Sequence, residues 1–568
     1  MNALAPLIVV PVVLPLVAAA VLLLIRDSRR RLGSLINITA TLGGLMVAVT
    51  ILWQVNVAAG PGAIAVHLTS NWAAPFGIAL VADRLSALML VLVGVVSTGA
   101  ALYAAAGWAR AGSYFHPLFQ IQLMGLNGAF LTGDLFNLFV FFEVMLAASY
   151  GLQLHGSGWP RVRSGMHYIA VNLLASSLFL VGLAILYGVM GTLSMADVAT
   201  KVALVPPGDR GLLHAGAAIL AMAFLIKAAV WPLNSWLVPA YTAASTPVAA
   251  LFVLMTKVGV YSILRLWMLL FPATMASSGQ FGGPLLMVAG LATLAFGAIG
   301  VLASIRLDRI AAFSIIVTSG TLLASFATGS IAASAAALFY LVSSTFAVSA
   351  LFLMVEPVQR TRSERHAQRP VYDNIPHEDD NLDDQQLPLV GRAFPVSVAA
   401  LGLAYMTCSL LVAGLPPLSG FLSKAAILTA IVGDDPAASV PTSTGVLMAL
   451  LLCASLFTTI SLVRAGIRHF WSAGGRFAPR LKLVESGAVL VLISTCLLLT
   501  VFAEPVLRYT TATATYLHAP RPYVRAVFDA PARPGPTTPD YAPYERAPYD
   551  SVPYDSAPHD SSLQADAP

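Results

Sequence analysis

Charged residues are scarce in this chain. Of its 568 residues, 10% are Asp, Glu, Lys or Arg, whereas 58% are hydrophobic. A soluble globular chain carries about 25% charged residues, so this chain could not cover the surface of a water-soluble protein. The mean hydropathy of +0.81 supports the same conclusion. These values exclude a soluble enzyme and a mostly disordered chain, and they indicate a membrane protein with many spans.

Cysteine is also rare, and recognisable catalytic motifs are missing. The three cysteines, Cys408, Cys453 and Cys496, lie in apolar runs without the spacing of metal ligands, so we interpret them as small buried side chains. The sequence contains no Walker A loop, dinucleotide fingerprint, Cys-x-x-Cys or His-Glu-x-x-His motif. We therefore expect no cofactor, no metal site and no nucleic-acid partner. Energy for transport would come from an ion gradient or from partner subunits.

Long apolar runs fill most of the sequence. A membrane-spanning helix needs about 20 mostly apolar residues, and these runs lack the two-residue alternation of membrane strands. The first run is followed, not preceded, by arginines, which predicts a retained span. The sequence thus predicts an all-α polytopic membrane protein with fourteen spans: 4–25, 33–55, 82–107, 115–132, 134–154, 165–189, 212–237, 246–270, 284–304, 309–329, 333–355, 395–431, 442–464 and 484–506.

The distribution of basic residues tests this segmentation. With the N-terminus outside, nineteen Arg and Lys residues, from Arg26 to Lys482, fall in cytoplasmic loops, and only Lys201 and Arg210 fall in opposite loops between spans. This asymmetry follows the positive-inside rule. It predicts fourteen spans with both termini on the outer side.

Two segments are too polar to lie in a membrane. The loop 356–394 continues from arginines into an acidic run, and the tail 508–568 ends in Pro-, Tyr- and Asp-rich near-repeats. We predict a solvated cytoplasmic loop and a disordered, low-complexity tail, which is either a dispensable extension or a docking segment. The predicted regions are therefore helices 1–3 (1–110), helices 4–8 (111–275), helices 9–13 (280–470), helix 14 (471–507) and the tail.

Four ionisable residues fall near the middle of predicted spans. These are Glu143, Lys227, Lys257 and Lys424, whereas Arg84, Arg265 and Asp308 lie at span ends from which they are expected to reach the interface. A charge at the bilayer centre costs about 2.5–3.5 kcal/mol on the insertion scale. One structural interpretation is that these charges pair and hold helices together. However, three lysines cannot all pair with one carboxylate, and a buried amine without a counter-ion can exchange its proton because desolvation disfavours the charge.

Two of the lysines lie in segments that contain helix breakers. Pro232 and Pro239 follow Lys227, and Pro416 and Pro417 precede Lys424. Proline interrupts helical hydrogen bonding, and interrupted helices in corresponding halves of a transporter indicate an ion pathway. Nearby polar side chains could connect the lysines through water or serve only in helix packing: His167, Tyr168, Asn172, Asn234, Ser235, Tyr241, Thr256, Ser343, Ser344 and Thr345.

Four blocks of sequence carry a family resemblance: ADRLSALM (82–89), LTGDLFNLFVFFEVMLAASYGL (131–152), the segment 226–267 beginning IKAAVWPLNSW, and AGLPPLSGFLSKAAIL (413–428). In these blocks the chain resembles the antiporter-like membrane subunits of respiratory complex I, membrane-bound hydrogenases and Mrp-type cation/proton antiporters. It is most similar to the D-type subunits of the Mrp (Pha) antiporters. The resemblance covers roughly residues 80–470.

The resemblance implies roles for the buried charges. Glu143 matches the family's span-five glutamate, Lys227 its partner on span seven, Lys257 the central relay position and Lys424 the lysine of broken span twelve. It also implies two inverted five-helix repeats, spans 4–8 and 9–13. Two positions depart from the family pattern, since Ser343 and Asn234 stand where many relatives have histidine.

The resemblance further implies a function and a location. The expected function is proton translocation in a multisubunit Na⁺(K⁺)/H⁺ antiporter of a bacterial inner membrane, together with other membrane subunits. The expected alternative is the equivalent subunit of complex I or a membrane-bound hydrogenase. The chain is thus expected to be a secondary-transporter subunit and no enzyme, with oxidoreductase activity only if the complex I alternative holds.

Overall fold

The computed structural model describes residues 6–25, 29–57, 64–273, 278–367, 396–433, 441–471 and 482–530. Most of the predicted acidic loop (368–395) and the Pro-, Tyr- and Asp-rich repeats lie outside these ranges. The described part is nearly all helical, with one antiparallel hairpin of strands β1 (Ala65–Leu68) and β2 (Ala79–Ala82). Its helices are α1 (Val10–Leu24), α2 (Arg30–Val57), α3 (Arg84–Ala105), α4 (Phe115–Leu131), α5 (Leu135–Leu154), α6 (Trp159–Met190), α7 (Met195–Lys201), α8 (Arg210–Lys227), α9 (Leu237–Ala243), α10 (Thr246–Leu270), α11 (Gly283–Ala303), α12 (Leu307–Ala327), α13 (Ile331–Ala367), α14 (Val396–Ala413), α15 (Ser419–Val432), α16 (Thr442–Gly466), α17 (Leu483–Val501), α18 (Ala503–Leu517) and α19 (Arg521–Phe528).

The helices confirm a multi-pass membrane protein. Within the described ranges, thirteen helices are long and apolar enough to cross a membrane. Helix α4, which has 17 residues, corresponds to the remaining predicted span. A helix rises about 1.5 Å per residue, so about 20 residues match the hydrocarbon thickness of about 30 Å.

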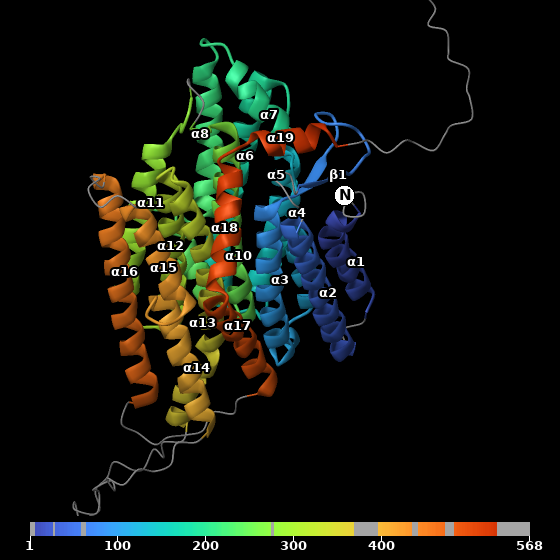
Figure 1. Cartoon of the computed structure of the whole chain (residues 1–568). Coiled ribbons are helices and arrows are strands. Elements are labelled where there is room, and N and C mark those ends of the chain that lie inside the picture. The colour runs from blue at the N-terminus through green and yellow to red at the C-terminus, as the bar shows by residue number, and fades with distance from the viewer. Residues whose placement is uncertain are drawn as a thin grey trace, which may run out of the picture. The chain divides into compact units, whose positions relative to one another are not determined.

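Helices α10 and α13 form the centre of the bundle (Figure 1). The most apolar part of each is completely buried, whereas α1, α2 and α16 expose many apolar side chains. Exposed apolar surface is stable in lipid but would be unfavourable in water. Charges on α10 are therefore enclosed by protein and do not face the bilayer.

Both predicted helix breaks are confirmed. Span seven consists of α8 and α9, which are separated by residues 228–236, and span twelve consists of α14 and α15, separated by 414–418. Prolines in both gaps lack the backbone N–H that would continue a helix. The indole of Trp236 donates to the Ile226 carbonyl (3.1 Å), which satisfies an acceptor in the last turn of α8.

The C-terminal segment differs from the prediction. Residues 508–530, expected to belong to a disordered tail, form most of α18 and all of α19. These helices bury Thr513, Ala514, Tyr523 and Val527, so they have an apolar face that packs on the bundle. The expectation was wrong for this segment because it is amphipathic, and its helices are stabilised by packing their buried face against the bundle.

Contacts between loops agree with the predicted alternation of spans. Arg30 donates to the Arg110 carbonyl (3.2 Å), and Lys482 donates to the Ala106 carbonyl (3.1 Å). Arg464 donates to the Leu302 carbonyl (2.6 Å). Each contact joins two helix ends or loops that the predicted alternation places on the same side, while the hairpin, α7 and α19 lie at the opposite end of the bundle (Figure 1).

Candidate functional site

The four predicted ionisable residues lie on four different helices. Glu143 is on α5, Lys227 is the last residue of α8, Lys257 is at the middle of α10, and Lys424 is on α15. The three lysines are 4%, 0% and 6% exposed, respectively. Lysines are almost never this buried unless their ammonium groups are paired, so their surroundings decide what they can do.

Glu143 and Lys227 are neighbours without direct ion-pair contact. The Ser176 hydroxyl on α6 donates to the Glu143 carboxylate. The Lys227 ammonium lies 5.1 Å from the centre of the Phe142 ring, and no described residue forms a hydrogen bond with it. It is near enough to Glu143 for electrostatic attraction. A cation that is held by an aromatic face and a nearby carboxylate remains free to change its partner.

A close approach packs α10, the helix of Lys257, against the end of α8 that carries Lys227. At Gly259 of α10, a Cβ atom would lie 2.7 Å from the Ala228 nitrogen and 3.0 Å from the Lys227 carbonyl carbon. Only glycine permits this approach, because any Cβ would overlap the α8 backbone. Lys257 is two residues from Gly259 and therefore points to a different side of α10, while the contact itself sets α10 against the break in span seven.

Lys257 has one polar partner among the described residues. Its ammonium donates to the Thr318 hydroxyl on α12 (2.6 Å), and that hydroxyl donates to the Ile315 carbonyl (2.7 Å). Sequence reasoning did not identify Thr318. It is one hydroxyl residue among several in α12, and nothing in the spacing distinguishes the one that faces Lys257.

A small cavity connects the surroundings of Lys257 with those of Lys424. Its volume is about 10 Å³, about the minimum that holds one water molecule. Thr318 lines it on one side and Val412 and Gly420 on the other. Hydroxyls in the same lining come from Ser314, Tyr340, Ser344 and Thr458.

Lys424 lies in the break of span twelve. Its ammonium donates to the Ala413 carbonyl (2.7 Å), the Ser455 hydroxyl (2.9 Å) and, at 3.4 Å, the Val412 carbonyl. These carbonyls end α14, where they lack intrahelical partners and carry the negative end of the helix dipole. Gly414 makes room for the side chain, since a Cβ there would lie 2.6 Å from the Lys424 Cδ.

Some of the predicted polar groups lie near the row formed by Lys227, Lys257 and Lys424, and others lie elsewhere. The Ser343 hydroxyl donates to Ser419 at the start of α15 (3.0 Å), and Ser344 lines the small cavity. Thr345 donates to the Leu341 carbonyl of its own helix (2.6 Å). His167 is exposed on α6, and Asn234 is buried beside a different cavity.

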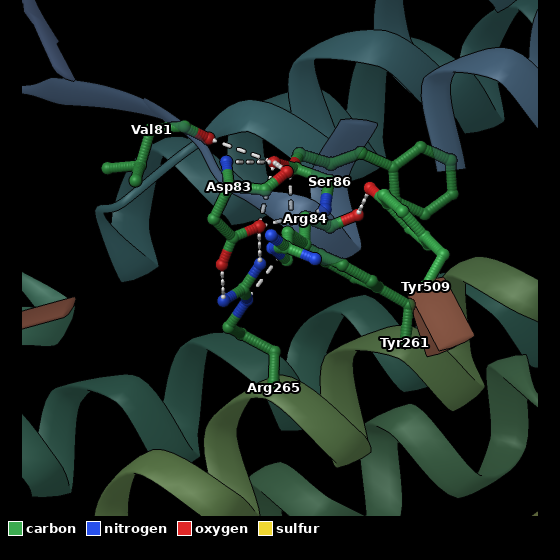
Figure 2. Close-up of polar contacts among 8 residues, drawn as sticks. Val81, Asp83, Arg84, Ser86, Tyr261, Arg265 and Tyr509 are labelled. Carbon is green, nitrogen blue, oxygen red and sulfur yellow. Dashed lines mark hydrogen bonds and ion pairs between the residues drawn. The ribbon is translucent and has the colours of Figure 1, made fainter. Parts of the chain in front are cut away.

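Arg265 does not reach the interface as expected. Its side chain is buried on α10 and forms a bidentate ion pair with Asp83, with one N–H···O bond of 2.7 Å (Figure 2). Asp83 also caps α3 by accepting from the Ser86 backbone N–H (2.9 Å). The guanidinium faces the rings of Tyr261 and Tyr523, at 5.5 and 5.4 Å from their centres. The prediction was wrong because Asp83 neutralises the arginine inside the protein.

The other two predicted interfacial residues also have protein partners. The Asp308 side chain is buried and pairs with Arg306. The Arg84 guanidinium lies 5.6 Å from the centre of the Tyr509 ring on α18.

A second charged cluster joins α13 to α17. Arg360 donates to Glu356 (2.6 Å) and to Glu485 (2.7 Å). Glu356 also accepts from the Trp108 indole (2.6 Å) and the Tyr103 hydroxyl (3.2 Å). Sequence reasoning placed Arg360 in a loop, whereas α13 continues through it. Within the described ranges, no group of three His, Cys, Asp or Glu side chains could hold a metal ion.

Comparisons with known proteins identify relatives along nearly the whole chain. The profile of the family described as NADH:quinone oxidoreductase/Mrp antiporter, TM, matches residues 132–458. The chain is 47% identical to the D-type subunit of a probable K⁺/H⁺ antiporter of Rhizobium meliloti, over 92% of this chain and 98% of that protein. It is 32% identical to the D-type subunit of the Na⁺/H⁺ antiporter of Alkalihalophilus pseudofirmus, over 92% and 99%.

Solved structures have the same fold. The Mrp complex from Dietzia sp. DQ12-45-1b contains a chain that is 26% identical, with a TM-score of 0.77 over 93% of this chain and 100% of that chain. Respiratory complex I from Thermus thermophilus contains a chain with a TM-score of 0.68 and 22% identity, over 90% and 99%. The profile match over more than half of the sequence and the identity to two antiporter subunits lead to one conclusion: the chain belongs to the NADH:quinone oxidoreductase/Mrp antiporter transmembrane family.

Proposed function

We propose that this chain is the proton-translocating subunit of a multisubunit Na⁺(K⁺)/H⁺ antiporter, and that Glu143, Lys227, Lys257 and Lys424 form its proton relay. The observation that carries the proposal is the row of three buried lysines across α8, α10 and α15. Each ammonium has a weak or exchangeable partner: an aromatic ring, a threonine hydroxyl, or carbonyls and a serine.

The mechanism follows from these partners. Glu143 attracts the charge on Lys227, and when the carboxylate moves away the lysine can release its proton, because burial disfavours an uncompensated charge. Lys257 is next along the row, and Thr318 can pass a proton because a hydroxyl both donates and accepts. One water in the small cavity would complete the path from Thr318 to Lys424.

The proposal extends to organisation and location. Spans 4–8 and 9–13 would form two inverted repeats, each with one broken span that carries a lysine. The chain would lie in a bacterial inner membrane with the arginine-rich loops in the cytoplasm and both termini outside. Other membrane subunits would be its partners, and Na⁺ or K⁺ would be the exchanged cation, as the names of the related antiporter subunits support.

The test is a Lys257→Met variant in the complete complex. Methionine keeps an unbranched side chain but cannot carry a proton. We expect cation-dependent collapse of the pH gradient in everted membrane vesicles to be lost, with the complex still assembled. Lys201→Met is the matched control, because Lys201 is on α7 and pairs with Asp197 (3.0 Å) outside the row. Full antiport by Lys257→Met would overturn the proposal.

Two alternatives give different results in the same experiments. If the buried charges serve only as a scaffold, Glu143→Gln should abolish assembly before it affects transport. If the chain serves a redox complex, NADH-oxidising or hydrogenase subunits should co-purify with it. The 47% identity to an antiporter subunit over nearly full length favours the antiporter.

A further inference from the structure

A cavity of about 350 Å³ opens between α9, α11 and α12, apart from the row of lysines. Its lining contains Arg306 and Arg309 from the start of α12, and Asn234 and Ser235 from the break in span seven. Thr242 adds a third polar side chain from this span. The cavity therefore joins a basic rim to the broken helix.

The charges at this cavity favour an anion. Arg306 is neutralised by its ion pair with Asp308. By contrast, no hydrogen bond or ion pair joins the Arg309 guanidinium to another described side chain. The positive charge of Arg309 therefore remains uncompensated at this cavity. It would repel protons and metal cations, which argues against an aqueous inlet for them.

A buried amide in the wall of this cavity also lacks a partner. Asn234 is 5% exposed, and its Nδ2 forms no hydrogen bond within the described structure. An unpaired buried donor is destabilising, so a ligand acceptor at this position would be stabilising. Arginine and amide N–H groups are suitable donors to phosphate oxygens.

The surroundings of the cavity are apolar and exposed. Phe296 lines the cavity, and two nearby residues in sequence, Ile299 one turn further along α11 and Ile305 next to Arg306, are 63% and 55% exposed. A free anion gains nothing from such a surface, whereas an acyl chain would cover it. The arginines at the start of α12 also lie on the side where positive charge gathers, and the cytoplasmic leaflet is rich in anionic lipid.

We propose that this cavity binds the phosphate headgroup of an anionic phospholipid, with Arg309 and Asn234 as donors and an acyl chain along Phe296 and Ile299. The site is independent of which cation is exchanged. It would place a lipid against the break that follows Lys227, so the bound lipid would also brace that segment.

The test counts lipids on the intact complex. Purified, delipidated complex is incubated with phosphatidylglycerol or phosphatidylcholine vesicles, and bound lipid is measured by native mass spectrometry. We expect Arg309→Gln to weaken phosphatidylglycerol binding about tenfold or more, since a charged hydrogen bond is lost, and Asn234→Leu to weaken it as well. Arg163→Gln removes the same charge from an exposed position on α6 and should have no effect.

Several results would overturn the proposal. Equal loss in Arg163→Gln and Arg309→Gln would indicate non-specific surface charge. Displacement of the lipid by excess inorganic phosphate would identify a site for a free anion. Equal binding of phosphatidylcholine would show that only the apolar surface matters. Unchanged lipid binding with an altered pH dependence of transport in Arg309→Gln would identify an aqueous inlet.

Discussion

The buried ion pair between Asp83 and Arg265 makes a quantitative prediction about stability. Asp83→Asn removes the negative charge but keeps a side chain that caps helices well, so the N-terminus of α3 is preserved. The two side chains are 1% and 6% exposed, and the variant leaves the guanidinium buried without its counter-ion. Breaking one partner of a buried pair costs about 3–5 kcal/mol, and we expect a loss in this range.

The cap gives an internal check on this magnitude. Asp83→Ala removes both the charge and the acceptor for the Ser86 N–H, so it should cost about 1 kcal/mol more than Asp83→Asn. The double variant Asp83→Leu/Arg265→Met removes both charges, and apolar replacement of a buried pair is often near neutral. It should therefore be more stable than the single variants Asp83→Leu and Arg265→Met.

The assay is unfolding of the purified protein in mixed micelles with increasing SDS, followed by far-UV circular dichroism. Glu504→Gln is the matched control, because the Glu504–Arg508 pair on α18 is 74% and 79% exposed. Exposed pairs contribute about 0–1 kcal/mol. A loss in Asp83→Asn no greater than in Glu504→Gln, or a double variant less stable than both singles, would refute the reasoning.

Two further changes test the site and its surroundings. Gly414→Ala should reduce antiport and destabilise the protein by about 1–2 kcal/mol, because φ is +76° there and a Cβ would lie 2.6 Å from the Lys424 side chain. Gly445→Ala is the control, since no atom lies near its Cβ position. Equal behaviour of the two variants in transport and SDS unfolding would contradict this prediction. Burial lowers the pKa of His155, which follows α5, despite its hydrogen bond to the Trp108 carbonyl. The imidazole of His155 therefore binds a proton more readily in the unfolded chain, so the stability of the folded protein should fall below about pH 6.5. Measured by SDS unfolding, the His155→Gln variant should lose less stability on acidification than the wild type. An identical pH profile of the two proteins would contradict the assignment.

The spans, the helix breaks and the buried lysines were predictable from the sequence. An apolar run of about 20 residues can be stable only where it crosses the hydrocarbon layer. Pro232, Pro416 and Pro417 lack a backbone donor, and this is a local property of the chain. Lys227, Lys257 and Lys424 were recognised because a charge is improbable in such a run. All of these follow from residues that are close together in sequence.

Contacts between distant residues could not be predicted in the same way. Arg265 lies 182 positions from Asp83, so only helix packing reveals that it is neutralised inside the protein. The same holds for Thr318 beside Lys257, since one hydroxyl in α12 resembles the next until the helix rotation is known. The packing of α18 against α13 was likewise hidden, because an amphipathic segment becomes ordered only against its partner surface.

Local composition therefore determined the membrane-spanning segments and which residues carry unusual charge, because the bilayer imposes one requirement on every span. The tertiary structure decided the partner of each charge. Desolvation makes a buried ion depend on atoms within about 3 Å of it, and helices that are remote in sequence supply most of those atoms. The difference between a paired structural arginine and an exchangeable lysine is thus a property of packing.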